Sequence, residues 1–205
     1  MTKLLEIKDI VVRFFGKYES YLLPLLKCIL AFLCFQTINS SIGYMERLKS
    51  LPVILILSLL CGVLPMNFTV GMSVLMILLH LYSLSLEVAI TALALFLVLF
   101  LVYFRFTPKD GVMALITPLC FKLRIPYIMP IASGLLREIY SVAAVVCGTI
   151  VFYFLDGISQ NAASLTAVEE ESLISKSKFD VSVGQILQNK EMFLVAGVFV
   201  LSAIV

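Results

Sequence analysis

The sequence predicts an all-α fold: a polytopic helical integral membrane protein with about five to seven membrane segments. Hydrophobic residues make up 61% of the 205 residues and charged residues 14%, whereas a soluble domain carries about 25% charged residues. Most charges lie at the amino terminus, in short loops and in one long polar segment. Two apolar runs have prolines in the middle, which predicts one or two broken or re-entrant helical hairpins among the full spans.

The first segment, residues 1–19, is predicted to be an amphipathic helix in the membrane interface. Leu4, Ile7, Val11 and Phe14 recur at helical spacing, and charged residues occupy most of the positions between them. This pattern is typical of a helix that lies in the membrane plane. Its basic residues would favour an anionic cytoplasmic surface. No uninterrupted apolar core follows the first charges, so the segment is not a signal peptide.

The next segment, residues 20–155, is predicted to be the membrane domain. Polar or proline-containing breaks divide it, and a spanning helix needs about 20 apolar residues. The cleanest apolar run is predicted to cross the membrane once without interruption. The predicted segments are residues 21–38, a broken pair at 51–84, the clean span at 86–104, a second broken pair at 111–136, and 138–155.

Both broken pairs are interrupted near their middle. Leu64–Phe68 interrupts residues 51–84, and Lys122–Ile125 interrupts residues 111–136. The pieces on either side are shorter than the about 20 residues that a span needs. Each pair is therefore either two short spans joined by a tight turn or a hairpin that enters the membrane and returns.

The breaks are the predicted substrate site. Each broken pair is followed by a full span, which is the order expected of an inverted repeat, and transporters place their sites at such discontinuous helices. A helix end inside the bilayer leaves backbone groups that only protein, water or a ligand can satisfy. The candidate substrate-binding residues are Lys122, Arg124, Pro126, Pro130, Pro65 and Asn67.

The depth of residues 122–125 decides what the two cations there do. A cation at the bilayer centre costs roughly 2.5–3.5 kcal/mol. If the turn is deep, Lys122 and Arg124 must face water, a carboxylate or a small anionic substrate. If it is shallow, they are ordinary anchors at the interface.

Three further ionisable residues are candidates for proton or ion coupling: His80, Glu87 and Glu138. His80 is the only histidine, and it either relays protons or is a hydrogen-bonded helix residue. Glu87 opens the clean span, where a carboxylate also suits a helix amino terminus. Glu138 either marks a membrane boundary or pairs with Lys122 or Arg124.

The rest of the chain is predicted to be a polar acidic loop, residues 156–190, with a short helix around 181–188. Residues 191–205 are apolar but shorter than a span. We expect them to begin a further transmembrane helix in a chain that is truncated after Val205. The alternative is a half-inserted terminal helix.

The positive-inside rule predicts the orientation. Four basic residues precede the first span, two follow it (Arg47 and Lys49), and two follow the clean span (Arg105 and Lys109). An amino terminus in the cytoplasm places Arg105 and Lys109 on the same side. The acidic loop is then outside if residues 111–136 return to the side from which they entered. The expected location is the inner (cytoplasmic) membrane, with several passes.

Several function classes are disfavoured. The five cysteines lie in apolar segments without metal-ligand spacing, so neither a disulfide framework nor a metal site is expected. The sequence contains no HExxH, GxSxG or P-loop motif, and no basic patch with interleaved aromatics. We expect no enzymatic activity, no cofactor and no nucleic-acid partner.

The leading hypothesis is a small permease or a membrane subunit of a transporter, with the short loops typical of a bacterial multi-pass protein. Its partners would be the lipid bilayer, a small anionic substrate, and other membrane subunits or a second copy of the chain. The alternative is a non-transporting membrane scaffold or anchor subunit of a larger membrane complex. A cavity that reaches Lys122 and Arg124 would favour transport.

Overall fold

The computed structural model describes residues 2–136, 139–167, 184 and 189–204. Helices with short turns between them make up this described part, which contains no strand, so the predicted all-α class is confirmed. The helices are α1 (Thr2–Ile42), α2 (Glu46–Lys49), α3 (Leu51–Val63), α4 (Met66–Leu84), α5 (Leu86–Phe106), α6 (Gly111–Lys122), α7 (Ile128–Leu136), the 3-10 helix η1 (Ile139–Ser141), α8 (Val142–Ala167) and α10 (Lys190–Ile204).

Four helices in the described residues are long and apolar enough to cross a membrane. They are Tyr18–Ile42 within α1, α4, α5, and Val142–Ala162 within α8. Many large apolar side chains on the outside of the bundle are exposed; Val63, for example, is 83% exposed and Leu101 67%. A lipid-facing surface accounts for such a pattern better than water does. These features support a membrane protein.

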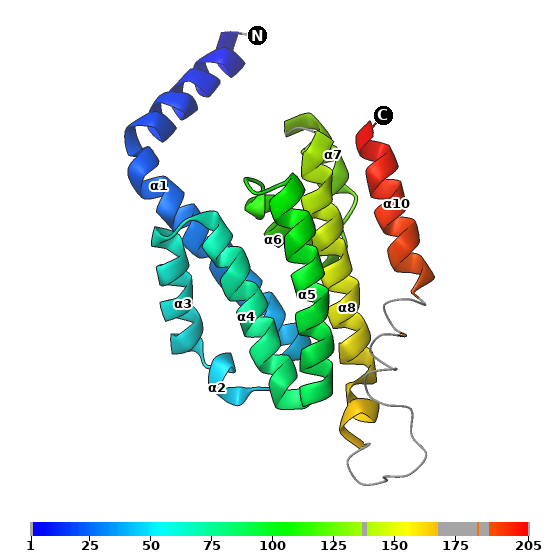
Figure 1. Cartoon of the computed structure of the whole chain (residues 1–205). Coiled ribbons are helices and arrows are strands. Elements are labelled where there is room, and N and C mark those ends of the chain that lie inside the picture. The colour runs from blue at the N-terminus through cyan, green and yellow to red at the C-terminus, as the bar shows by residue number, and fades with distance from the viewer. Residues whose placement is uncertain (1, 137–138, 168–183, 185–188, 205) are drawn as a thin grey trace.

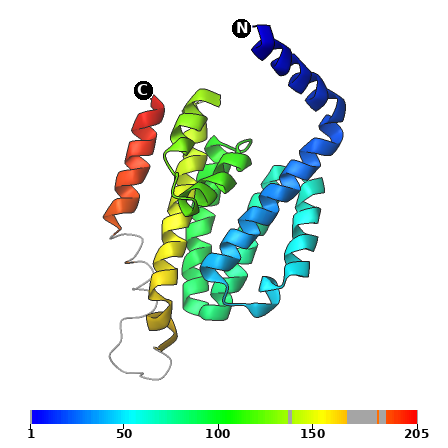
Figure 2. The ribbon, with the colours of Figure 1, turned by 180° about the vertical axis from the view of Figure 1, so that it is seen from behind.

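Of the long helices, α1, α4 and α8 run in one direction along the bundle and α5 runs in the opposite direction. Figures 1 and 2 show the start of α1, the end of α5 and the start of α8 toward one end, and α2 with the start of α5 at the other. The amino-terminal part of α1 extends away from the bundle (Figure 1). The predicted interfacial segment therefore continues directly into the first span as one helix.

The first predicted break is present at Leu64 and Pro65. α3 ends at Val63 and α4 begins at Met66, and Leu64 has φ −84° and ψ 164°. Proline lacks an N–H group and favours an extended residue before it, so the helix ends here. Only α4 of this pair has the length of a span, because α3 has 13 residues.

The second predicted break is a turn between α6 and α7. Ile125 N–H donates to Cys120 O at 2.9 Å, and Arg124 N–H donates to Phe121 O at 3.0 Å. This pair of bonds defines a Schellman motif, with Arg124 at the position that usually holds glycine. Arg124 has φ of 61°, so a non-glycine residue is held in the left-handed region.

α6 packs alongside α8 in the same direction. Ser141 Oγ donates to Asp110 Oδ2 at 2.6 Å at the start of both helices. Further along, a Cβ atom on Gly148 would lie 2.7 Å from Thr117 Cβ, so glycine permits the close approach. Near the end of α6, Phe121 stacks on Phe152 with ring centres 4.7 Å apart. α6 thus ends beside the middle of α8, which continues to Ala167.

α7 turns back from the end of α6. Met129 is buried in a cluster with Cys120 of α6, Val145 of α8 and Phe199 of α10. Figure 1 places α7 at the end of the bundle where α8 begins. α6 and α7 therefore form a hairpin whose turn, residues 123–127, lies partway along the bundle.

The acidic loop was predicted to begin at residue 156, but α8 continues to Ala167. Gln160 Nε2 donates to Asp156 Oδ2 at 2.7 Å, and Asn161 Nδ2 donates to Gly157 O. Such contacts between residues four apart stabilise a helix without any apolar face. The change to polar residues therefore marks the end of the apolar span and not the end of the helix.

Glu138 and most of the acidic loop, including the predicted short helix at 181–188, lie outside the described residues. The apolar stretch after residue 190 forms α10, which has 15 residues.

Candidate functional site: a cavity beside the broken helix

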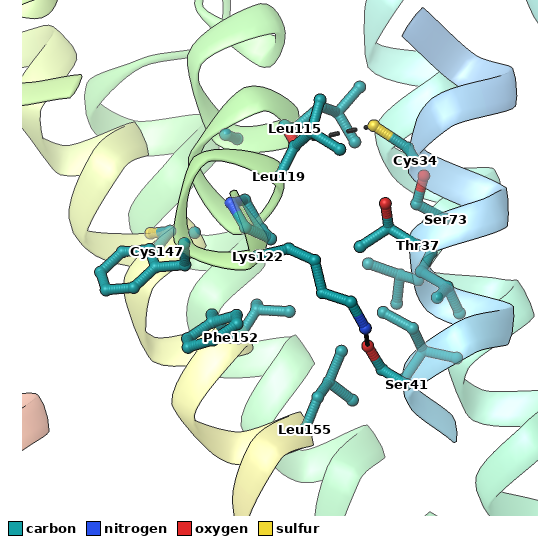
Figure 3. Close-up of a pocket in the computed structure, with 18 of the residues that line it drawn as sticks. Cys34, Thr37, Ser41, Ser73, Leu115, Leu119, Lys122, Cys147, Phe152 and Leu155 are labelled. Carbon is teal, nitrogen blue, oxygen red and sulfur yellow. Dashed lines mark hydrogen bonds between the residues drawn. The ribbon is translucent and has the colours of Figure 1, made fainter. Parts of the chain in front are cut away.

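A cavity of about 350 Å³ lies between α1, α4, α5, α6 and α8. Each helix contributes a face to it, and α6 contributes from Ala114 to Lys122. Figure 3 shows α1 and α6 on opposite sides of this space, with Cys34 near one end and Ser41 near the other. The second broken pair therefore forms one wall of the cavity.

The inner end of the cavity is closed where α4, α5 and α6 meet. Tyr103 OH donates to Asn67 Oδ1 at 2.9 Å. A Cβ atom on Gly111 would lie 3.0 Å from Tyr103 OH and 3.2 Å from Val70 Cγ2. Tyr103 and Val70 also line the cavity, so this tight junction forms its closed end.

The walls of the cavity are mainly apolar. Side chains of Phe96, Leu119, Phe152 and Leu155 line them. The few polar atoms there are largely engaged with the backbone: Ser73 Oγ donates to Thr69 O, and Cys34 Sγ donates to Leu115 O at 3.6 Å. A ligand in this part of the cavity would meet hydrocarbon surface and few free donors.

The outer end of the cavity is polar and open. Lys122 extends from α6 across to α1, where its Nζ donates to Ser41 Oγ at 3.0 Å (Figure 3). Arg124, Asp156 and Ser159 also line this end, and all three side chains are exposed. On α8 the lining runs from Cys147 to Ser159, which corresponds to about 18 Å of helix.

The charges at this polar mouth favour an anion. Two cations, Lys122 and Arg124, face one carboxylate, Asp156. Asp156 accepts a hydrogen bond from Gln160, while Lys122 donates to the neutral hydroxyl of Ser41. An ammonium and a guanidinium close together bind carboxylate or phosphate oxygens well.

The structure brings two of the six predicted substrate-binding residues to the cavity, Lys122 and Arg124. The other four lie elsewhere. Asn67 holds Tyr103 at the closed end, and Pro65 precedes α4 as its N-cap. Pro126 lies in the turn after Arg124, where its carbonyl accepts from Met129 N–H, and Pro130 is buried in the first turn of α7.

His80 lies at a separate buried junction. Met45 N–H donates to Nδ1 at 3.2 Å, so Nε2 carries the proton and donates to Asn39 Oδ1 at 2.7 Å. Asn39 Nδ2 in turn donates to Leu48 O. These contacts assign the neutral tautomer. His80 joins α4 to the end of α1 and to α2, an arrangement that favours the hydrogen-bonded alternative over a proton relay.

Glu87 is exposed in the first turn of α5. Its carboxylate there suits the positive end of the helix dipole. It lies outside the cavity lining. Ion coupling at Glu87 and Glu138 stays a prediction.

The sequence did not single out most of the polar residues that line the cavity. Thr37, Ser41 and Ser73 are small hydroxyl residues within apolar helices, and such residues are common in membrane helices for packing alone. Asp156 and Ser159 were assigned to the loop. Their spacing in the helix, four residues from Phe152 and from Leu155, was the signal that could have placed them on the same face.

Within the described ranges, no group of histidine, cysteine or acidic side chains is placed to hold a metal ion. The five cysteines are unbridged, and four of them are buried. The polar mouth is therefore the place in the described structure where charged side chains gather at a cavity.

In the part of the chain that the structure describes, the fold and the cavity together define a class: an all-helical bundle with four helices suited to crossing a membrane and a half-open cavity among them. The chain matches no known protein-family model, and no curated protein or solved structure matches it.

Proposed function

We propose that this chain is a multi-pass membrane protein that acts as a small permease or as a membrane subunit of a transporter. Its substrate is an anion that binds at the polar mouth. The observation that carries this proposal is the cavity that reaches Lys122 and Arg124 beside the broken helix. A scaffold subunit needs no such cavity, whereas a transporter needs one.

The length of α6 supports a position of the Lys122 backbone inside the bilayer, from which its Nζ extends to Ser41 near the end of α1. Its 12 residues extend about 18 Å, while the hydrocarbon core is about 30 Å thick. A hairpin that starts at the interface at Gly111 would place Lys122 beyond the midplane. A cation there costs roughly 2.5–3.5 kcal/mol unless it is solvated or paired. The open mouth supplies water, and a bound anion would supply the pairing.

The orientation follows from the basic residues at the two ends of the bundle. Arg105 lies in the last turn of α5, and Lys109 lies two residues before α6 begins. Figure 1 shows that α5 ends at the end of the bundle where α8 begins. With that end in the cytoplasm, the hairpin enters from the cytoplasm and the mouth faces the opposite side. The closed end at Tyr103 then separates the cavity from the cytoplasm.

Uptake into vesicles tests the proposal. The purified chain is reconstituted, and entry of radiolabelled phosphate, acetate and decanoate is measured against empty vesicles. We expect uptake of at least one anion, and we expect Arg124→Ala to abolish it without reducing insertion. Arg105→Ala removes an exposed arginine outside the cavity lining and should leave uptake unchanged.

Two outcomes would contradict the proposal. Equal uptake by the wild type and Arg124→Ala would exclude the mouth as the site. A correctly inserted protein that moves none of the three anions would favour the scaffold alternative.

A further inference from the structure

The cavity combines an apolar chamber with a cationic mouth. Its inner part is lined by side chains such as Phe96, Leu119 and Cys147, and its outer part by Lys122 and Arg124. A small hydrophilic anion would occupy the mouth alone and leave the chamber empty. Apolar cavities do not hold water well. In that arrangement the apolar surface of the chamber would contribute nothing to the binding free energy.

We infer that the cavity binds a single-chain amphiphile with an anionic head group, a carboxylate or a phosphate monoester. The head lies between Lys122 and Arg124, and the chain extends along α8 toward Cys147. This inference rests on the proposed function and deepens it, because it names the substrate class for the same site.

The size of the chamber limits the chain. The cavity volume is about 350 Å³, and an apolar cavity of about 150 Å³ accommodates benzene. The chamber therefore holds one chain on the order of ten carbons. A lipid with two long chains is too large for it. The lining between Cys147 and Ser159 on α8 extends about 18 Å, which matches one extended chain with its head group.

The head group is selected by charge and by hydrogen-bond donors. Lys122 Nζ now donates to Ser41 Oγ, a neutral partner that an anionic oxygen would replace or join. Arg124 provides a planar fork that suits two oxygens at once. Asp156, on the facing helix, lowers the net positive charge of the mouth and so weakens, without cancelling, its attraction for an anionic head.

Direct binding tests the inference. The full chain is placed in phosphatidylcholine nanodiscs, and equilibrium binding of radiolabelled alkyl phosphates from butyl to tetradecyl is measured against empty nanodiscs. Each added methylene should tighten binding about fourfold until the chamber is full, with no further gain beyond about ten carbons. Decanoate tests the carboxylate head, and decanol tests whether charge is needed.

Matched variants locate the site. Lys122→Gln with Arg124→Gln should weaken decyl phosphate binding about ten- to a hundredfold, because charged hydrogen bonds are lost. Arg105→Gln with Lys109→Gln removes two exposed cations outside the cavity lining and should leave binding unchanged. Cys147→Phe should shorten the preferred chain, because it fills the inner chamber.

A variant that folds better but binds worse excludes a general folding defect. Arg124→Gly removes a head-group contact and also relieves the left-handed backbone of residue 124. We expect it to weaken binding while the protein unfolds at a higher temperature.

The outcomes separate this inference from the proposed function. Decanol that binds as tightly as decyl phosphate, or equal binding by the double glutamine variant, would mean nonspecific lipid partition and would overturn the inference. Uptake of phosphate or acetate without binding of any amphiphile would overturn it and leave transport standing. Charge-dependent binding without uptake would retain the ligand class and refute transport.

Discussion

Arg124 occupies a backbone conformation that glycine adopts most easily. Its φ is 61°, and the left-handed conformation costs a residue with a side chain roughly 1–2 kcal/mol. Such strain gathers at functional sites, where a side chain is needed despite its cost. The guanidinium lines the cavity mouth, which explains why this position is arginine and not glycine.

Arg124→Gly should therefore stabilise the fold by about 1 kcal/mol. The measurement is reversible unfolding in detergent micelles, followed by circular dichroism. Leu123→Gly is the matched control: Leu123 has φ −79°, so glycine there gains no relief and should cost about 0.5–1 kcal/mol. A loss of stability in Arg124→Gly would show that the arginine side chain stabilises the turn by more than the strain.

His80 contributes through the two hydrogen bonds of its ring. Replacing it with leucine leaves Met45 N–H and Asn39 Oδ1 without this partner, at a cost of about 1–3 kcal/mol for each buried group. His80→Leu and Asn39→Ala, singly and together, should give a coupling energy of about 0.5–3 kcal/mol. Tyr82→Leu, on an exposed position of the same helix, is the control and should show no coupling to Asn39.

Uptake by the His80→Leu variant, measured as a function of pH, also tests the role of His80. A structural residue lowers stability without changing the pH dependence of uptake. A proton relay would show the reverse, with stability retained and uptake made independent of pH.

At the scale of elements, the contact between α6 and α8 fixes the hairpin that lines the cavity. A Cβ atom on Gly148 would lie 2.7 Å from Thr117 Cβ and 2.9 Å from Ala114 O. These neighbours are a side-chain stem and a backbone atom, so they yield little. The close approach places Phe121 on Phe152 and holds Lys122 at the cavity mouth.

Gly148→Ala should destabilise the protein by about 1–3 kcal/mol through this overlap. Gly71→Ala is the matched control, because nothing lies within 4 Å of a Cβ atom there and alanine favours a helix interior by about 0.5–1 kcal/mol. Thermal unfolding of both variants in the same detergent checks the difference. Equal melting temperatures would mean that α6 and α8 are not in this contact.

The sequence predicted the first helix break because Pro65 ends a helix by local chemistry, whereas Pro118 lies inside α6 and does not end it. Pro65 lacks a donor and restricts Leu64, and both effects follow from the residues themselves. The extent of α8 was not predicted, because Asp156 and Gln160 continue the helix through a contact that carries no apolar signal. The apolar residues of α8 identified the membrane span, and hydrogen bonds between polar residues extend the helix beyond that span.

The cavity could be predicted only in part. Lys122 and Arg124 stood out because charges are rare in apolar runs. The opposing wall could not be predicted: Ser41 precedes Lys122 by 81 positions, and no local pattern pairs them. A contact between residues so far apart in the sequence depends on how α1 and α6 pack, and a single sequence does not determine that packing by any local pattern.

At the scale of the whole molecule, the two ends of the bundle differ in how they border the cavity. The end with Arg105 and Lys109 holds the base of the hairpin, where Ser141 donates to Asp110. The opposite end holds α2 with Arg47. The hairpin and the mouth thus define an axis with a closed end and an open end.

The orientation of this axis gives the final prediction. With the amino terminus in the cytoplasm, a cysteine at Arg47 is outside and a cysteine at Lys109 is inside; both positions are exposed. In a variant without the five native cysteines, an impermeant maleimide applied to intact cells should label Arg47→Cys. Lys109→Cys should react only after the membrane is opened. Labelling of Lys109→Cys alone in intact cells would reverse the axis. Labelling of both would refute this topology, in which α3 and α4 together return to the side of Arg47 and α5 crosses once. The mouth is expected to lie on the side of Arg47, so Ser159→Cys should react with the maleimide in intact cells, as Arg47→Cys does. Saturating decyl phosphate should slow the reaction of Ser159→Cys, because the head group covers the mouth.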